Sequence, residues 1–112
     1  MRVGPNWPQG GEIDIAEGVN EYTSNQVTLH TTPGCTMPST DPNALGITGS
    51  VTASADCETE ATGNAGCGWR DTRSNSWGAP FNSNGGGVYT SELRPYLCRG
   101  GTLTHKRASA MG

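Results

Sequence analysis

The segment from Glu12 to Glu17 reads Glu-Ile-Asp-Ile-Ala-Glu, so acidic residues alternate with the apolar Ile13 and Ile15. This alternation predicts a β-strand with one buried face, and it places Glu12 and Asp14 together on the other face. Two side chains two positions apart lie roughly 6 to 7 Å from each other along a strand. Because like charges this close disfavour joint ionisation, we expect one carboxyl of the group to have a raised pKa. Such a pair can supply a protonated acid beside an ionised base or nucleophile.

Glu17 does not fit the alternation, because it lies five residues after Glu12 and would point to the buried face. One extra residue around Ile15 and Ala16, a β-bulge, would return Glu17 to the face of Glu12 and Asp14. Bulges occur preferentially next to active sites. The two glutamate carboxyls could then approach to about 5 Å, the separation that a retaining glycosidase needs. From the three acids alone, an exposed acidic strand or a cation site remains the alternative interpretation.

Short motifs surround this acidic strand on both sides. In chain order, with the strand included, they occupy residues 7–11, 12–20, 25–31, 33–35, 63–68, 81–82 and 85–89. Together they resemble glycoside hydrolase family 16, and within it the fungal branch of endo-1,3(4)-β-glucanases, often called laminarinases. The resemblance covers most of residues 4–89. Several motifs in the family's order are more specific than the acidic motif alone.

The resemblance implies a role for each of the three carboxylates. Glu12 matches the family's catalytic nucleophile, Glu17 matches its general acid/base, and Asp14 matches the middle carboxylate that hydrogen-bonds the nucleophile. In that scheme Glu12 attacks the anomeric carbon while Glu17 protonates the departing oxygen. Glu17 then activates the water that releases the glycosyl-enzyme, and the anomeric configuration is retained. We expect no metal ion and no cofactor.

Two further residues are predicted to contact substrate. Trp7 resembles the family's sugar-stacking tryptophan, and an indole suits the apolar face of a pyranose ring; the alternative is a tryptophan packed in the core or a turn. His30 matches a histidine that faces the family's catalytic cleft, although a lone histidine is more often structural. For Trp69 and Trp77, lining of the cleft and packing in the core are both open.

The composition indicates a protein of strands and turns. The 112 residues include 17 glycines and 7 prolines, only 15% are charged, and no segment shows a helical stripe. Residues 26–31, 49–53 and 87–90 have strand character. The resemblance implies an all-β fold, a β-jelly-roll sandwich of two curved antiparallel sheets like those of concanavalin A-like lectins and glucanases, with substrate across the concave face.

The length points to part of such a sandwich, because a domain of this type generally has about 200 to 250 residues. We therefore expect a partial jelly roll, a fragment truncated at both ends. Residues 1–89 are interpreted as a portion of the catalytic core, and residues 90–112 as a divergent basic tail. The charge changes near the same point, since residues 1–92 carry a net charge of −7 and residues 93–112 a net charge of +4.

The four cysteines stand at positions 35, 57, 67 and 98, and no two of them form a Cys-x-x-Cys pair. This pattern argues against a zinc ribbon or a thioredoxin-like site and favours disulfides. Four cysteines can pair in three ways. We expect the pairing that contains the bond Cys57–Cys67.

A neutral polysaccharide, β-glucan, is the partner that the resemblance implies. The net charge of −3 gives no attraction to nucleic acids or anionic membranes, and the basic tail has no interleaved aromatic residues. We expect a monomer, secreted as family members typically are, although Met1-Arg2-Val3-Gly4 begins no apolar signal segment. The function predicted is endo-hydrolysis of β-1,3 or mixed β-1,3/1,4 glucan. The alternative is a non-catalytic glucan-binding remnant or an inactive truncated product.

Overall fold

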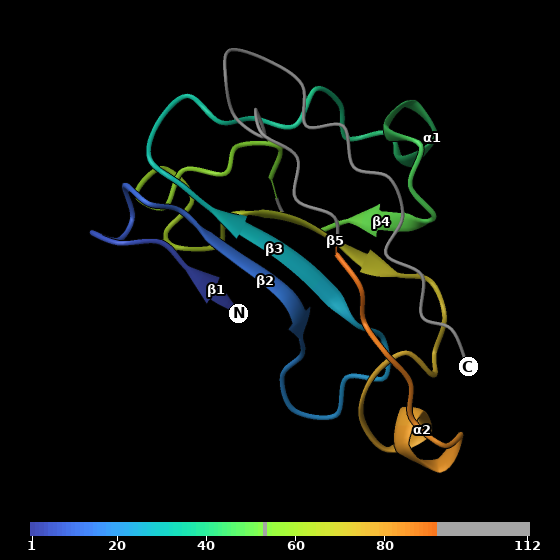
Figure 1. The fold of residues 1–112 in the computed structure, drawn as a ribbon. Helices are drawn as coiled ribbons and strands as arrows, with labels where there is room; N and C mark the ends of the chain where they lie inside the picture. The colour runs from blue at the N-terminus through green and yellow to red at the C-terminus, as the bar shows by residue number, and fades with distance from the viewer. Residues whose placement is uncertain (53, 92–112) are drawn as a thin grey trace.

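The computed structural model describes residues 1–52 and 54–91. In this part of the chain, five antiparallel strands form one sheet in the order β1-β2-β3-β5-β4 (Figure 1). The elements are β1 (Arg2–Val3), β2 (Glu12–Glu17), β3 (Gln26–His30), α1 (Pro42–Leu45), β4 (Gly49–Val51), β5 (Cys67–Asp71) and α2 (Gly78–Ser83). The predicted dominance of strands is confirmed, and both helices are too short to show a stripe.

The strand runs predicted from sequence match the structure in two of three cases. Residues 26–31 and 49–53 contain β3 and β4, whereas residues 87–90 form no named strand in the described part of the chain. The predicted basic tail lies outside the described residues from position 92 onward, and so does Cys98.

The pairing of β2 with β3 shows the predicted bulge. Glu12 pairs with His30 and Asp14 pairs with Thr28, but the next pair is formed by Glu17 and residue 26 of β3. The step is three residues on β2 and two on β3, so β2 contains one extra residue between Asp14 and Glu17. The parity of the strand is thereby reset, and all three acidic residues share one face of the sheet.

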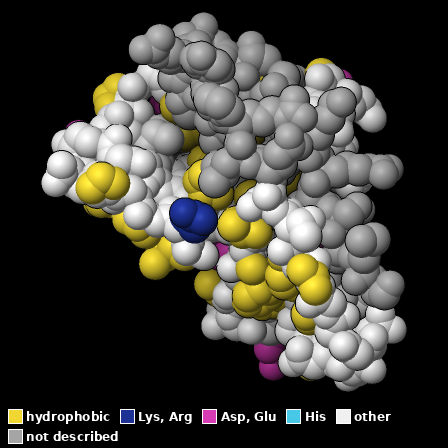
Figure 2. Space-filling view, in the orientation of Figure 1, with side chains coloured by type: hydrophobic (Ala, Val, Ile, Leu, Met, Phe, Trp, Pro, Cys, Tyr) yellow, Lys and Arg dark blue, Asp and Glu magenta, His cyan; other side chains and the backbone are white. Residues whose placement is uncertain are grey.

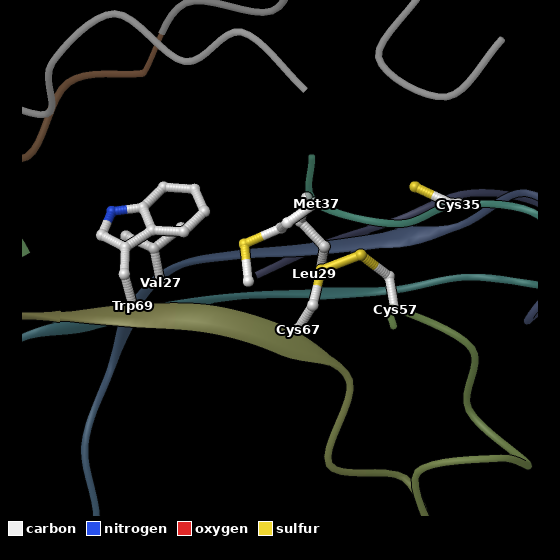
Figure 3. Packing of buried hydrophobic residues seen from close by; sticks show 7 residues of the cluster. All are labelled: Val27, Leu29, Cys35, Met37, Cys57, Cys67 and Trp69. Atoms are coloured by element: carbon white, nitrogen blue, oxygen red, sulfur yellow. A yellow bond between two sulfur atoms is a disulfide. The ribbon is translucent and has the colours of Figure 1, made fainter. Parts of the chain in front are cut away.

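The opposite face of the sheet carries the hydrophobic core. Val27 and Leu29 of β3 pair with Trp69 and Cys67 of β5, and all four residues are buried. Figure 3 shows their side chains on one side of the two strands, with Met37 pointing toward them from a neighbouring segment. Burying an aliphatic side chain of this size contributes about 1.5–3 kcal/mol. This packing holds β3, the central strand, in the register that positions the acidic face.

The segment that follows β3 is tied back to the sheet. Cys57 and Cys67 form the predicted disulfide, with Cα atoms 4.3 Å apart and ten positions apart in sequence. The Thr31 amide donates to the Cys57 carbonyl at 2.9 Å, and the Cys57 amide donates to the Cys35 carbonyl at 3.0 Å. The end of β3 that bears His30 is therefore held by the hydrogen bond from Thr31 to Cys57, and the disulfide links Cys57 to β5.

Hydrophobic side chains also reach the surface. Figure 2 shows them on both sides of the view, toward α2 and toward β1, with a dark-blue side chain between the two groups. Val3, Val19 and Val88 are among the exposed large apolar residues. None of the helices in the described ranges is long and apolar enough to cross a membrane.

Candidate active site

Strand β2 presents Glu12, Asp14 and Glu17 on the face opposite the core. Strand β3 lies alongside and contributes three polar residues to the same face, because Gln26, Thr28 and His30 are their cross-strand partners. Six polar side chains thus form two facing rows. The sequence predicted the first row and, of the second, only His30.

Glu12 is held by the predicted tryptophan. The Trp7 indole Nε1 donates a hydrogen bond to Glu12 Oε2 at 2.8 Å. Trp7 lies in the turn that joins β1 to β2, and this turn is closed by a hydrogen bond from the Gly4 amide to the Gly11 carbonyl at 2.8 Å. Trp7 is 45% exposed, so part of the residue remains open to solvent beside the carboxylate.

Asp14 and His30 form a buried pair, with His30 Nε2 3.6 Å from Asp14 Oδ2. Burial raises the pKa of Asp14, the charges of Glu12 and Glu17 raise it further, and His30 opposes the rise. The sequence predicted that one carboxyl of the acidic group has a raised pKa, and in the structure this carboxyl is Asp14.

His30 Nδ1 is buried without a hydrogen-bond partner in the described part of the chain. It lies beside Gly66, where an added Cβ would be 2.9 Å from Nδ1 and 2.3 Å from the Leu29 carbonyl oxygen. Gly66 also has φ +63°, a conformation that favours glycine. The backbone thus packs directly against the imidazole.

Glu17 is bound at one oxygen by two donors from β3. The Thr28 hydroxyl and Gln26 Nε2, the latter at 3.3 Å, both donate to Glu17 Oε2. Arg70 Nη2 donates to Gln26 Oε1 at 2.8 Å, which turns the amide nitrogen toward Glu17 because a guanidinium can only donate. Arg70 in turn lies over the ring of Tyr22, 4.1 Å from its centroid.

Sequence reasoning missed Gln26, Thr28 and Arg70 as residues of this face. A usable signal exists in β3, where polar residues 26, 28 and 30 alternate with Val27 and Leu29. Arg70 carries no local signal. Its place depends on the pairing of β3 with β5, in which residues 26 and 70 are partners.

The two remaining tryptophans differ in position. Trp69 packs on the core face, as one of its two open interpretations proposed. Trp77 is half-buried and lies against the end of β2, since a Cβ on Gly18 would be 2.3 Å from its Nε1. Its ring also lies 6.4 Å from that of Tyr89, centroid to centroid.

A pocket of about 540 Å³ opens beside β1 and reaches Glu12 at its margin. Ile13, Leu29 and Cys35 are among its lining residues, whereas Asp14 and Glu17 are not. Because Ile13 and Leu29 point away from the carboxylates, the pocket belongs mainly to the apolar face. In residues 1–52 and 54–91, no group of three or more His, Cys, Asp or Glu side chains could hold a metal ion.

The chain is similar in sequence to fungal proteins named as a glycosidase and as glucanases. The probable glycosidase C21B10.07 of Schizosaccharomyces pombe is 46% identical over 94 residues, which cover 82% of this chain and 22% of that protein. The endo-1,3(4)-beta-glucanase xgeA of Emericella nidulans is 44% identical over 90 residues, covering 80% of this chain and 13% of that protein. The chain thus spans less than a quarter of the length of these relatives.

Solved structures agree with the sequence relatives. Laminarinase 16A from Phanerochaete chrysosporium, solved with 6-O-glucosyl-laminaritriose in donor and acceptor sites, matches with a TM-score of 0.67 and 45% identity. The match covers 75% of this chain and 26% of that one. An elongating family 16 β-1,3-glucosyltransferase matches with a TM-score of 0.63 and 42% identity over 78% of this chain and 27% of that one. The fold is thus part of the β-jelly roll of these enzymes, as predicted.

A sequence model described as the XgeA-like catalytic domain of glycoside hydrolase family 16 matches residues 2–99. This range includes both rows of polar residues described above. The chain belongs to glycoside hydrolase family 16, in the branch of the fungal endo-1,3(4)-β-glucanases.

Proposed function

We propose that this chain carries the catalytic carboxylates of an endo-hydrolase of β-1,3 or mixed β-1,3/1,4 glucan, which acts with retention of configuration. The observation that carries the proposal is the bulged register of β2, because it puts Glu12 and Glu17 on one face despite their odd spacing. The glucanase relatives and the laminarinase bound to β-glucan support the substrate class.

In the first step, an oxygen of Glu12 bonds to the anomeric carbon as the bond to the departing sugar oxygen breaks. The proton that Glu17 carries moves to that departing oxygen. The Trp7 indole fixes Glu12 by its hydrogen bond to Oε2. Because Thr28 and Gln26 both bind Oε2 of Glu17, we assign the proton transfer to Oε1.

In the second step, water attacks the same carbon and gives its proton to Glu17, and the bond to Glu12 breaks. Two inversions leave the original configuration. Asp14 lies between the two glutamates, and burial together with the charges of Glu12 and Glu17 raises its pKa. In its protonated form this carboxyl can donate a hydrogen bond to a neighbouring carboxylate. The partly exposed Trp7 is assigned to stacking on a glucose ring.

The test measures release of reducing sugar from laminarin by the wild-type chain and by Glu12→Gln and Glu17→Gln. Glu17→Gln is expected to lower the rate by at least about 10²-fold, the smaller end of what a positioned acid or base supplies. Glu12→Gln removes the nucleophile and is expected to lower the rate by at least as much. Glu21→Gln is the matched control, since Glu21 is exposed and lies beyond β2. A Glu17→Gln variant as active as the control would contradict the proposal. Binding to insoluble glucan without turnover by the wild type would favour the non-catalytic alternative.

A second reaction of the same intermediate is favoured by the likeness to a β-1,3-glucosyltransferase. If a sugar hydroxyl replaces water in the second step, the product is a longer glucan rather than a shorter one. Chromatography of the products from a laminari-oligosaccharide separates the two outcomes. Products longer than the substrate indicate transfer, and only shorter products indicate hydrolysis.

A further inference from the structure

The extra residue of β2 is bracketed by a single side chain. Asn25 Oδ1 accepts a hydrogen bond from the Glu17 amide at 3.0 Å, and Asn25 Nδ2 donates to the Ile15 carbonyl at 3.0 Å. A bulge interrupts the ladder between neighbouring strands, and a buried backbone group without a partner costs stability. One carboxamide therefore satisfies a donor and an acceptor on the two sides of the bulge.

Asn25 is itself firmly placed. It is 6% exposed and precedes β3 directly. The backbone amide of Asn25 donates to Ser76 Oγ at 2.9 Å, and its backbone carbonyl accepts from the Asp71 amide at 2.9 Å. The backbone of Asn25 is thus tied to the end of β5 and to the buried Ser76 in the loop beyond it.

We propose that Asn25 is the positioning residue for Glu17, holding the bulge in the register that directs this carboxylate to the catalytic face. A slip of one residue would send the Glu17 side chain to the opposite face. The inference rests on the proposed role of Glu17, and it adds a residue that touches no reacting atom. A carboxamide suits these two contacts, because it carries an acceptor and a donor on one planar group.

Substitutions at this position give graded effects. Asn25→Leu keeps the approximate shape and removes both hydrogen bonds. Asn25→Asp keeps an acceptor for the Glu17 amide but sets a second oxygen against the Ile15 carbonyl. Ser24→Ala is the matched control, since it removes a side-chain hydrogen bond of the preceding residue, from Ser24 Oγ to the Arg73 carbonyl at 2.7 Å, and leaves the contacts of Asn25 in place.

The first measurement is amide hydrogen exchange of the full chain by nuclear magnetic resonance, which needs no activity. Asn25→Leu is expected to speed exchange at the Glu17 amide by about tenfold relative to the amides of the β3–β5 ladder, because local opening controls exchange. Asn25→Asp should show a smaller change at this amide, and Ser24→Ala should show no change beyond that of the ladder amides. An unchanged Glu17 amide in Asn25→Leu would overturn the inference.

The second measurement compares two substrates by kcat/KM. A laminari-oligosaccharide needs a proton on its departing sugar, whereas a 2,4-dinitrophenyl β-laminaribioside has a leaving group that departs as the anion. Asn25→Leu is expected to lower the ratio of the first kcat/KM to the second by about tenfold or more, a part of the ~10²–10⁴-fold that a general acid supplies. Asn25→Asp should lower it less, and Ser24→Ala should leave it unchanged.

Glu17→Gln separates failure of the inference from failure of the proposed function. If Glu17→Gln lowers the ratio and Asn25→Leu does not, Asn25 does not position the acid and the inference is wrong. If Glu17→Gln leaves the ratio unchanged, the proposed role of Glu17 fails, and the exchange measurement alone decides whether Asn25 holds the bulge.

Discussion

The hydrogen bond from Thr28 to Glu17 can be tested by its contribution to the stability of the folded chain. Thr28 is 1% exposed, and its hydroxyl donates to Glu17 Oε2 while accepting from Gln26 Nε2 at 3.1 Å. Thr28→Val removes the hydroxyl, and a methyl group fills its place, so no cavity is expected. At a pH where Glu17 is ionised, a hydrogen bond to this charged group contributes about 1.5–3 kcal/mol. Because Glu17 is only half-buried and keeps Gln26 as a donor, we expect the lower end, about 1.5 kcal/mol.

A double-mutant cycle isolates this contribution. The free energy of unfolding is measured by urea titration, followed by circular dichroism, for the wild type, Thr28→Val, Glu17→Ala and the double variant. If the two side chains interact as described, the double variant loses about 1.5 kcal/mol less than the sum of the single losses. Losses that add to within about 0.5 kcal/mol would refute the interaction and, with it, the described surroundings of Glu17.

Three other expectations concern stability. Replacing Cys57 and Cys67 together by alanine opens a loop of ten positions, and the chain-entropy relation gives a loss of about 2.7 kcal/mol, measurable by urea titration; an unchanged midpoint would contradict the disulfide's role. Gly18→Ala forces a Cβ against Trp77, so a lower melting temperature and altered tryptophan fluorescence are expected, and wild-type values for both would contradict the contact. Because the pKa of Asp14 is raised above 3.8, the folded chain holds this proton more tightly than the unfolded chain, and the charged carboxylate weakens folding at higher pH. Asp14→Asn should therefore gain stability relative to the wild type as pH rises from about 3.8 through the raised pKa, and a pH-independent difference between the two chains would contradict the shift.

Local pattern was enough to predict the acidic strand and its bulge. The parity of Glu12, Asp14 and Glu17 along one strand is a property of adjacent residues, and one extra residue between Asp14 and Glu17 puts all three on one face. The disulfide between Cys57 and Cys67 also closes a short loop. Such features need little knowledge of the distant chain.

The supports of the site could not be predicted in the same way. Arg70 contacts Gln26 across 44 positions, and Ser76 contacts Asn25 across 51. Both contacts exist only after β5 has paired with β3 in one register, which no local pattern specifies. The same register also determines which way Trp69 points. Arg70 lies on the face of the three acidic residues, so its neighbour Trp69 faces the core.

The central claim is that Glu12 is the nucleophile and Glu17 the acid/base on one face of a bulged strand. Its most direct test is peptide mapping by mass spectrometry after reaction with a 2-deoxy-2-fluoro-β-laminaribioside that bears a dinitrophenyl leaving group, because such a sugar forms the glycosyl-enzyme and releases it slowly. We predict that the added glycosyl mass lies on Glu12 and is absent from Glu12→Gln. An adduct on Asp14 or Glu17, or no adduct in a folded wild-type chain, would contradict the claim.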